Sequence, residues 1–83
     1  PARAEKVLTL YLAALAAEPG FAPGYAERLG ALSGALDAPP APLRAGLAAS
    51  YRHAGRFDRA EDWLYRWGEL EPEAAGRWAE GFY

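Results

Sequence analysis

The sequence predicts an all-α fold, and two observations lead to this prediction. No segment with β-branched residues alternates apolar and polar side chains over four residues or more, and the whole chain contains one valine, one threonine and no isoleucine. Prolines and glycines divide it into stretches of helical length, in which apolar residues recur at steps of three and four. We expect one domain over residues 1–83, with helices at about 3–18, 22–36, 42–54, 58–70 and 73–82.

Composition excludes several functional classes. The net charge is −2, so the chain lacks the basic surface that nucleic-acid-binding proteins present to phosphates, and no nucleic acid is expected as a partner. There is no cysteine, which leaves no disulfide framework and no thiolate for zinc or redox chemistry. This usage fits a cytoplasmic protein, and the abundant alanine and arginine are typical of a GC-rich, bacterial genome.

The first helix, over residues 3–18, is expected to be the most buried. Leu8, Tyr11 and Leu15 fall on one face of it, and further leucines and alanines widen that face. The apolar run 7–17 has eleven residues, whereas a bilayer core needs about 20 residues in a helix. No membrane is therefore expected as a partner.

The second helix, over residues 22–36, has a narrower apolar stripe. Its members recur at steps of four, three and four residues: Tyr25, Leu29, Leu32 and Leu36. Gly30 and Gly34 lie alongside this stripe. Each weakens the helix by about 1 kcal/mol relative to alanine, and each allows another backbone to approach closely.

The third helix, over residues 42–54, follows a proline-rich segment, and Pro42 suits a first turn that needs no amide donor. Its inner face carries Leu43, Leu47, Tyr51 and Ala54. Gly55 is expected to adopt the left-handed conformation that ends a helix. Asp58 and Glu61 have the spacing of a capping box, so the next helix should begin after a tight turn.

The fourth helix, over residues 58–70, is rich in aromatic side chains. Its apolar residues keep steps of three and four: Ala60, Trp63, Leu64, Trp67 and Leu70. Tyr65 points elsewhere and should be exposed. The fifth helix, over residues 73–82, follows Pro72 and brings Trp78 and Phe82 to pack against the fourth.

The segment 41–74 resembles a tetratricopeptide repeat, a helix-turn-helix unit of about 34 residues. Counting back from Pro72, the family's leucine, small residue, tyrosine, alanine and large apolar residue find counterparts in Leu47, Ala48, Tyr51, Ala60 and Leu64. Arg44 departs from the pattern where tryptophan is common, and Trp67 departs where a small residue normally faces the next repeat. The resemblance implies antiparallel hairpins in a right-handed array, with four helices and a short fifth.

Two further observations bear on the array. Arg3-Ala4-Glu5 matches Arg59-Ala60-Glu61, and Glu18-Pro19 matches Glu71-Pro72, which indicates two related helix-proline-helix units. The helices from residues 22 and 43 both resemble the first helix of a repeat, so residues 28–40 fit the family poorly. Repeat arrays usually need three or more units, so we expect either self-association or excision from a longer protein.

The resemblance also implies a function, namely a non-catalytic protein-protein interaction or scaffolding module. Such domains hold an extended peptide or a helix against the first helix of each repeat. The positions that face this groove correspond to Pro42, Ala45, Gly46, Ala49, Arg52 and His53. We take Ala45, Ala49, Arg52 and His53 as the candidate peptide groove. The family's chaperone-tail clamp uses lysine and asparagine at three positions held here by Ala45, Gly46 and Ala49, so that clamp is disfavoured.

Catalytic and metal-binding patterns are not found in the sequence. Ser50 and His53 are neighbours on one helix, but no orienting acid or oxyanion donor accompanies them. One histidine with carboxylates such as Asp58 and Asp62 falls short of the ligand set for zinc. We therefore expect no enzyme activity, no metal and no cofactor.

Two further sets of residues are candidate contacts. Arg52, Arg56 and Arg59 gather near the Gly55 turn, and their planar guanidinium groups suit carboxylates or phosphates. The alternative is a solvated surface on which neighbouring acidic residues neutralise these arginines. The second set is a candidate aromatic interface: Trp67, Trp78, Phe82 and Tyr83.

The partners expected are another protein or peptide, or a second copy of this chain, because the apolar side of the fifth helix has nothing after it in the sequence to cover it. An alternative function stays open at this point. The 83 residues could form an accessory helical domain that positions a separate catalytic or regulatory domain.

Overall fold

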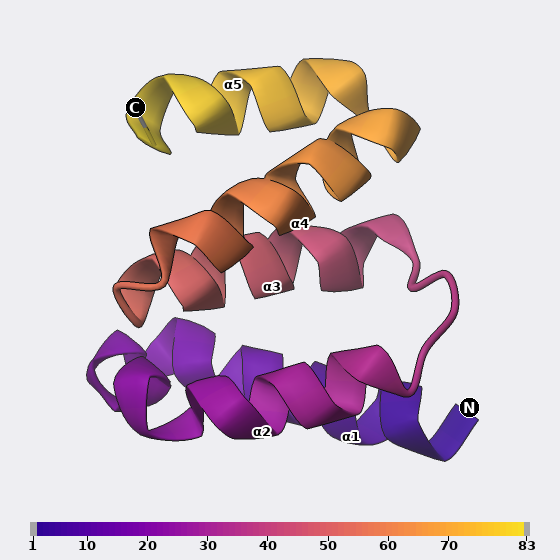
Figure 1. Ribbon diagram of the computed structural model, residues 1–83, viewed down its shortest axis with the longest axis vertical. Helices are drawn as coiled ribbons and strands as arrows, with labels where there is room; N and C mark the ends of the chain where they lie inside the picture. The colour runs from indigo at the N-terminus through magenta and orange to yellow at the C-terminus, as the bar shows by residue number, and fades with distance from the viewer. Residues whose placement is uncertain (1, 83) are drawn as a thin grey trace.

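The computed structural model describes residues 2–82 and has no strand in that range (Figure 1). Its elements are α1 (Ala2–Ala17), the short 3₁₀ turn η1 (Pro19–Phe21), α2 (Ala22–Gly34), α3 (Ala41–His53), α4 (Phe57–Leu70) and α5 (Pro72–Phe82). The all-α prediction is confirmed. The helix bounds differ from the expected ones by at most two residues, and η1 is an addition, because the Pro19-Gly20 break forms a helical turn of its own.

Along the long axis of the molecule, α1 and α2 lie together at one end, α3 and α4 follow, and α5 lies at the other end (Figure 1). Helix α3 contacts α1, α2 and α4, whereas α5 packs mainly on α4. In residues 2–82 no single helix is long and apolar enough to cross a bilayer. Only α1 and α2 together have that length and hydropathy, and they are bent by 116° at their junction.

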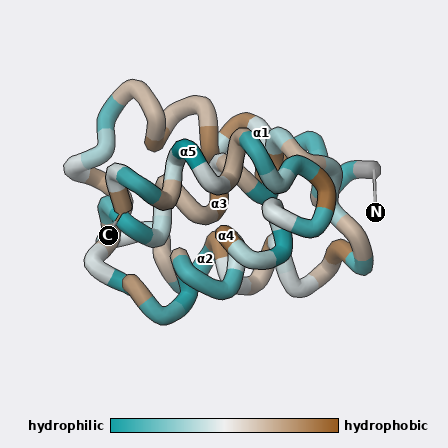
Figure 2. Tube along the Cα trace, turned by 90° about the horizontal axis from the view of Figure 1, so that it is seen from above, coloured by the Kyte–Doolittle hydropathy of each residue, from teal (hydrophilic) through white to brown (hydrophobic). Residues whose placement is uncertain are grey.

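The main core joins the first four helices. Its buried residues are Leu8, Leu12, Leu15, Ala22, Ala26, Leu29, Leu43, Leu47, Ala48, Tyr51, Ala60 and Trp63. A second cluster of Leu64, Trp67 and Ala75 lies between α4 and α5. Helix α4 therefore has apolar contacts on two sides. In Figure 2, teal stretches of α4 and α5 are interrupted by white to brown ones.

Trp67 fixes α5 to α4. Its side chain is buried, its ring meets that of Trp78 edge-on with centroids 6.1 Å apart, and its indole N–H donates a hydrogen bond of 2.9 Å to Glu71. The large residue at this position therefore fills the space between two helices. The sequence placed Trp67 in a candidate interface, but its burial leaves it inaccessible to a partner.

Arg44 connects the loop before α3 to the end of α4. Its Nε donates to the carbonyl of Pro39 at 2.7 Å and its Nη1 to the carbonyl of Arg66 at 2.6 Å. The guanidinium also lies 3.8 Å from the exposed carboxylate of Glu69. A buried arginine with these bonds occupies the position at which the tetratricopeptide pattern favours tryptophan.

The turn between α3 and α4 has the geometry of a Schellman motif. Gly55 has a φ of +77°, and its N–H donates to Arg52, while the N–H of Arg56 donates to Tyr51. The left-handed conformation expected for Gly55 is confirmed. The capping box expected at Asp58 is wrong, because Arg56 holds the cap position, no side chain caps the helix and Asp58 lies inside the first turn.

Substitution of Gly55 tests the strain at this turn. Gly55→Ala is expected to lower the free energy of unfolding by about 1–2 kcal/mol, because a side chain is disfavoured in the left-handed region. The matched control is Gly76→Ala in the middle of α5, where a Cβ meets no atom within 4 Å. That variant should gain up to about 1 kcal/mol from helix propensity. Urea unfolding followed by circular dichroism measures both, and equal effects would contradict the assignment.

Candidate functional site

The candidate groove residues form one strip along α3. Pro42, Ala49 and His53 succeed one another at steps of seven and four residues, so they share one side of the helix. Pro42 and His53 are exposed and Ala49 is half-buried. This side of α3 is therefore partly open to solvent, and we call it the α3 strip.

Two neighbouring helices border the α3 strip. On one side, a Cβ at Gly46 would lie 2.9 Å from Cδ1 of Leu12, so α1 approaches the backbone of α3 here. On the other side, Ala45 packs against the cluster between α4 and α5, and Arg52 reaches Gly81 of α5. Ala45 and Arg52 therefore line the α5 border of the strip, while Ala49 and His53 lie nearer its middle.

The three arginines do not form one anion site. Arg52 donates a hydrogen bond of 2.9 Å to the carbonyl of Gly81, and its guanidinium lies 5.7 Å and 5.9 Å from the ring centroids of Trp78 and Phe82. Arg52 therefore holds α5 in place. Arg56 and Arg59 lie beyond the Gly55 turn and line a different surface.

Arg56 and Arg59 border a depression of about 270 Å³ between α2 and α4. Tyr51 forms part of it, and the guanidinium of Arg59 lies 5.9 Å from the Tyr51 ring centroid. The absence of a side chain at Gly30 leaves room for the guanidinium of Arg59, because a Cβ at this position would lie only 3.2 Å from Nη1 of Arg59. Glu27 also lines this depression, so its lining combines two cationic residues with an acidic one.

A larger depression of about 760 Å³ adjoins this one and shares Gly30, Tyr51 and Arg59 with it. Asp58 and Asp62 also line it. The acidic neighbours expected from the sequence therefore lie on the same surface as Arg59. The mixed charge gives this surface no net preference for an anion.

The residues of the candidate aromatic interface have different surroundings. Trp67 is buried, whereas Trp78 and Phe82 are half-buried and their rings stack with centroids 5.2 Å apart. The ring of Phe57, which is exposed, meets Phe82 edge-on at 6.1 Å. Tyr83 lies outside the described residues. Among the described residues, the accessible aromatic surface at this end of the molecule is therefore formed by Phe57, Trp78 and Phe82.

A second aromatic surface, which sequence analysis missed, lies where α1 turns into α2. Tyr11, Phe21 and Tyr25 border a depression of about 280 Å³ together with Glu18 and two apolar residues of α1, Ala14 and Leu15. The rings of Tyr11 and Tyr25 are tilted by 47° with centroids 5.7 Å apart. Phe21 is exposed. It lies in the three-residue turn η1, which is too short for the spacing of apolar residues to assign it to a helix face.

Arg28 lies next to this depression without lining it. Its Nη1 donates a hydrogen bond of 2.8 Å to the hydroxyl of Tyr11, and its guanidinium lies 5.9 Å from the ring centroid. The hydrogen bond to Tyr11 raises the pKa of the Arg28 guanidinium above its ordinary value. Arginine is charged in proteins in any case, and the bond from Arg28 orients the Tyr11 ring.

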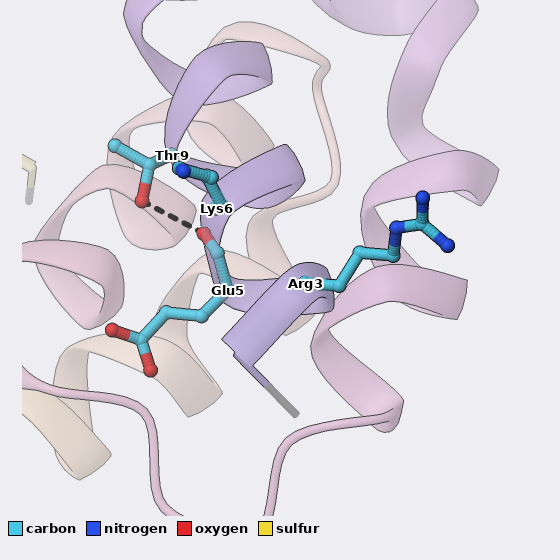
Figure 3. Close-up of a pocket in the computed structure, with 4 residues that line it drawn as sticks. All are labelled: Arg3, Glu5, Lys6 and Thr9. Atoms are coloured by element: carbon cyan, nitrogen blue, oxygen red, sulfur yellow. Dashed lines mark hydrogen bonds between the residues drawn. The ribbon is translucent and has the colours of Figure 1, made fainter.

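A further depression, near the start of α1, has no convergent group. Figure 3 shows that Arg3, Glu5 and Lys6 point away from one another, and the hydroxyl of Thr9 donates a hydrogen bond of 2.8 Å to the backbone carbonyl of Glu5.

Ser50 and His53 lie in unlike surroundings, since Ser50 is buried and His53 is exposed. Among the described residues, no group of three or more histidine, cysteine, aspartate or glutamate residues is placed to hold a metal ion.

Comparison with known proteins gives no relative. No family model matches the sequence, and neither the curated proteins nor the solved structures include a match to this chain.

Proposed function

We propose that the chain is a non-catalytic protein-protein interaction module of tetratricopeptide type. The order of helix contacts supports this proposal. Helix α1 packs on α2 and on α3, α3 packs on α4, and α4 packs on α5. In such an arrangement α1, α3 and α5 are the first helices of successive hairpins, and α2 and α4 are the second helices.

The observation that carries the proposal is the α3 strip. It lies between α1 and α5, where a tetratricopeptide array holds its ligand, and its middle is formed by a small residue, Ala49, between the exposed Pro42 and His53. A small side chain on a half-open helix face leaves room for another backbone to approach. An extended or helical peptide segment of a partner fits such a surface.

Selection of peptides from a displayed library tests the proposal. The selected peptide is expected to bind the 83-residue chain saturably in a calorimetric titration. Ala49→Arg should weaken this binding about tenfold or more, since it places a long charged side chain in the middle of the α3 strip. The matched control is Ala31→Arg on an exposed position of α2, which should leave the affinity unchanged.

Circular dichroism and the urea midpoint of both variants establish that they fold. Failure to select any saturably binding peptide would contradict the proposed function. Equal binding by both arginine variants would show that the peptide does not use the α3 strip.

A further inference from the structure

The depression between α1 and α2 combines three features that favour a cation. Its lining includes the aromatic residues Tyr11, Phe21 and Tyr25, whose ring faces carry partial negative charge. It includes one carboxylate, that of the exposed Glu18. No lysine or arginine is among the described residues that line it; the guanidinium of Arg28 lies beside it and donates to the hydroxyl of Tyr11.

The end of α1 adds a further negative contribution. The last turn of this helix contains no basic residue, so the partial negative charge of its carbonyl groups is not compensated locally. The carbonyl of Leu15, a residue of the depression, cannot receive a helical hydrogen bond from residue 19, because Pro19 has no N–H. A cationic ligand is therefore favoured over an anionic one by rings, carboxylate and helix terminus together.

We propose that this depression binds the ammonium group of a lysine side chain from a partner protein. The proposal rests on the interaction function proposed above and specifies the chemistry of one contact. The depression has a volume of about 280 Å³. One water molecule occupies roughly 30 Å³, so there is room for an ammonium group and several methylenes.

Lysine fits this depression better than arginine does. The rings of Tyr11 and Tyr25 are tilted by 47° rather than parallel, which suits a compact ammonium group more than a flat guanidinium. One carboxylate at the rim provides a partner for a point charge, whereas a guanidinium forms its strongest pairs through two parallel hydrogen bonds. The apolar surface of Ala14 and Leu15 accommodates the methylene stem.

Titration of the 83-residue chain with Nα-acetyl-lysine methylamide, followed by ¹H–¹⁵N NMR, tests the proposal. Saturable shifts are expected at the amides of Ala14, Leu15 and Tyr25. The neutral norleucine analogue has the same stem without the ammonium and should bind about fivefold more weakly or worse. Equal binding of the lysine and norleucine compounds would show that the depression is an apolar pocket. The absence of any saturable shift would exclude a lysine site. Either result overturns the proposal.

Two variants separate the contributions of charge and ring. Glu18→Gln keeps the shape and removes the charge, and Phe21→Leu keeps an apolar side chain and removes the ring. Each is expected to weaken lysine binding roughly two- to fivefold. The matched controls are Glu73→Gln and Tyr65→Leu at exposed positions on α5 and α4, and they should have no effect. If the controls weaken binding as much as the test variants do, the proposed contacts are wrong.

The two proposals fail in different ways. If Ala49→Arg weakens binding of the library-selected peptide but the capped lysine does not bind, the proposed interaction function stands and the proposed lysine site is wrong. If the capped lysine binds but Ala49→Arg has no effect on any selected peptide, the lysine site stands without the α3 strip.

Discussion

Replacement of Tyr51 by alanine is expected to lower the free energy of unfolding by about 3–5 kcal/mol, the range for removing a large buried aromatic side chain. Tyr51 is 1% exposed and lies in the main core on α3. Its hydroxyl comes within 3.4 Å of the place where a Cβ at Gly30 would lie, and Arg59 covers its ring. Truncation therefore removes a contact shared by α2, α3 and α4.

Urea unfolding followed by circular dichroism measures this effect. A domain of this length has a total stability of about 4–12 kcal/mol, so Tyr51→Ala should bring the chain close to unfolding at room temperature. Tyr51→Phe keeps the ring and is expected to cost less than about 1.5 kcal/mol. A loss below about 1 kcal/mol for the alanine variant would show that the three helices do not depend on this side chain.

The role of Tyr51 was predictable from the sequence because it follows from local spacing. Leu43, Leu47 and Tyr51 recur every four residues, which places them on one helix face whatever the rest of the fold is. Gly55 was predictable for the same reason, since the end of a helix is set by residues next to it. Helix positions and much of the core depend on such local information.

The three arginines show where local information fails. Arg52, Arg56 and Arg59 are close in sequence, but a helix ends between the first and the second. The Gly55 turn sends Arg52 toward α5, whereas Arg59 lies over Tyr51 beside α2. Proximity in sequence across a reversal of the chain does not predict proximity in space.

The depression between α1 and α2 was missed for a related reason. Tyr25 was assigned to the apolar stripe of the second helix, and Tyr11 to that of the first. Their rings meet because the chain bends by 116° through η1, a geometry that the spacing within either helix does not contain. Phe21 completes the depression from the turn itself. Sites that form between elements therefore need the packing angle as well as the sequence pattern.

Arg44 is the position at which sequence reasoning and structure differ most. The sequence showed only a departure from a family pattern, whereas the structure shows a buried guanidinium bonded to two backbone carbonyls. We expect Arg44→Met to lower the free energy of unfolding by about 2–4 kcal/mol. Methionine fills much of the volume, but it leaves the carbonyl of Pro39, a buried residue, without its charged donor.

Glu69→Gln provides the control, because it alters only the ion pair of Arg44. The Glu69 side chain is 72% exposed and 3.8 Å from the guanidinium, so this change should cost less than about 1 kcal/mol. Similar losses for the two variants would show that the ion pair, rather than the carbonyl bonds, gives Arg44 its effect. A larger loss for Arg44→Met than for Glu69→Gln would show that Arg44 holds the loop before α3 to α4 through two backbone carbonyls. A tryptophan at this position has a single side-chain N–H and could not donate to both carbonyls.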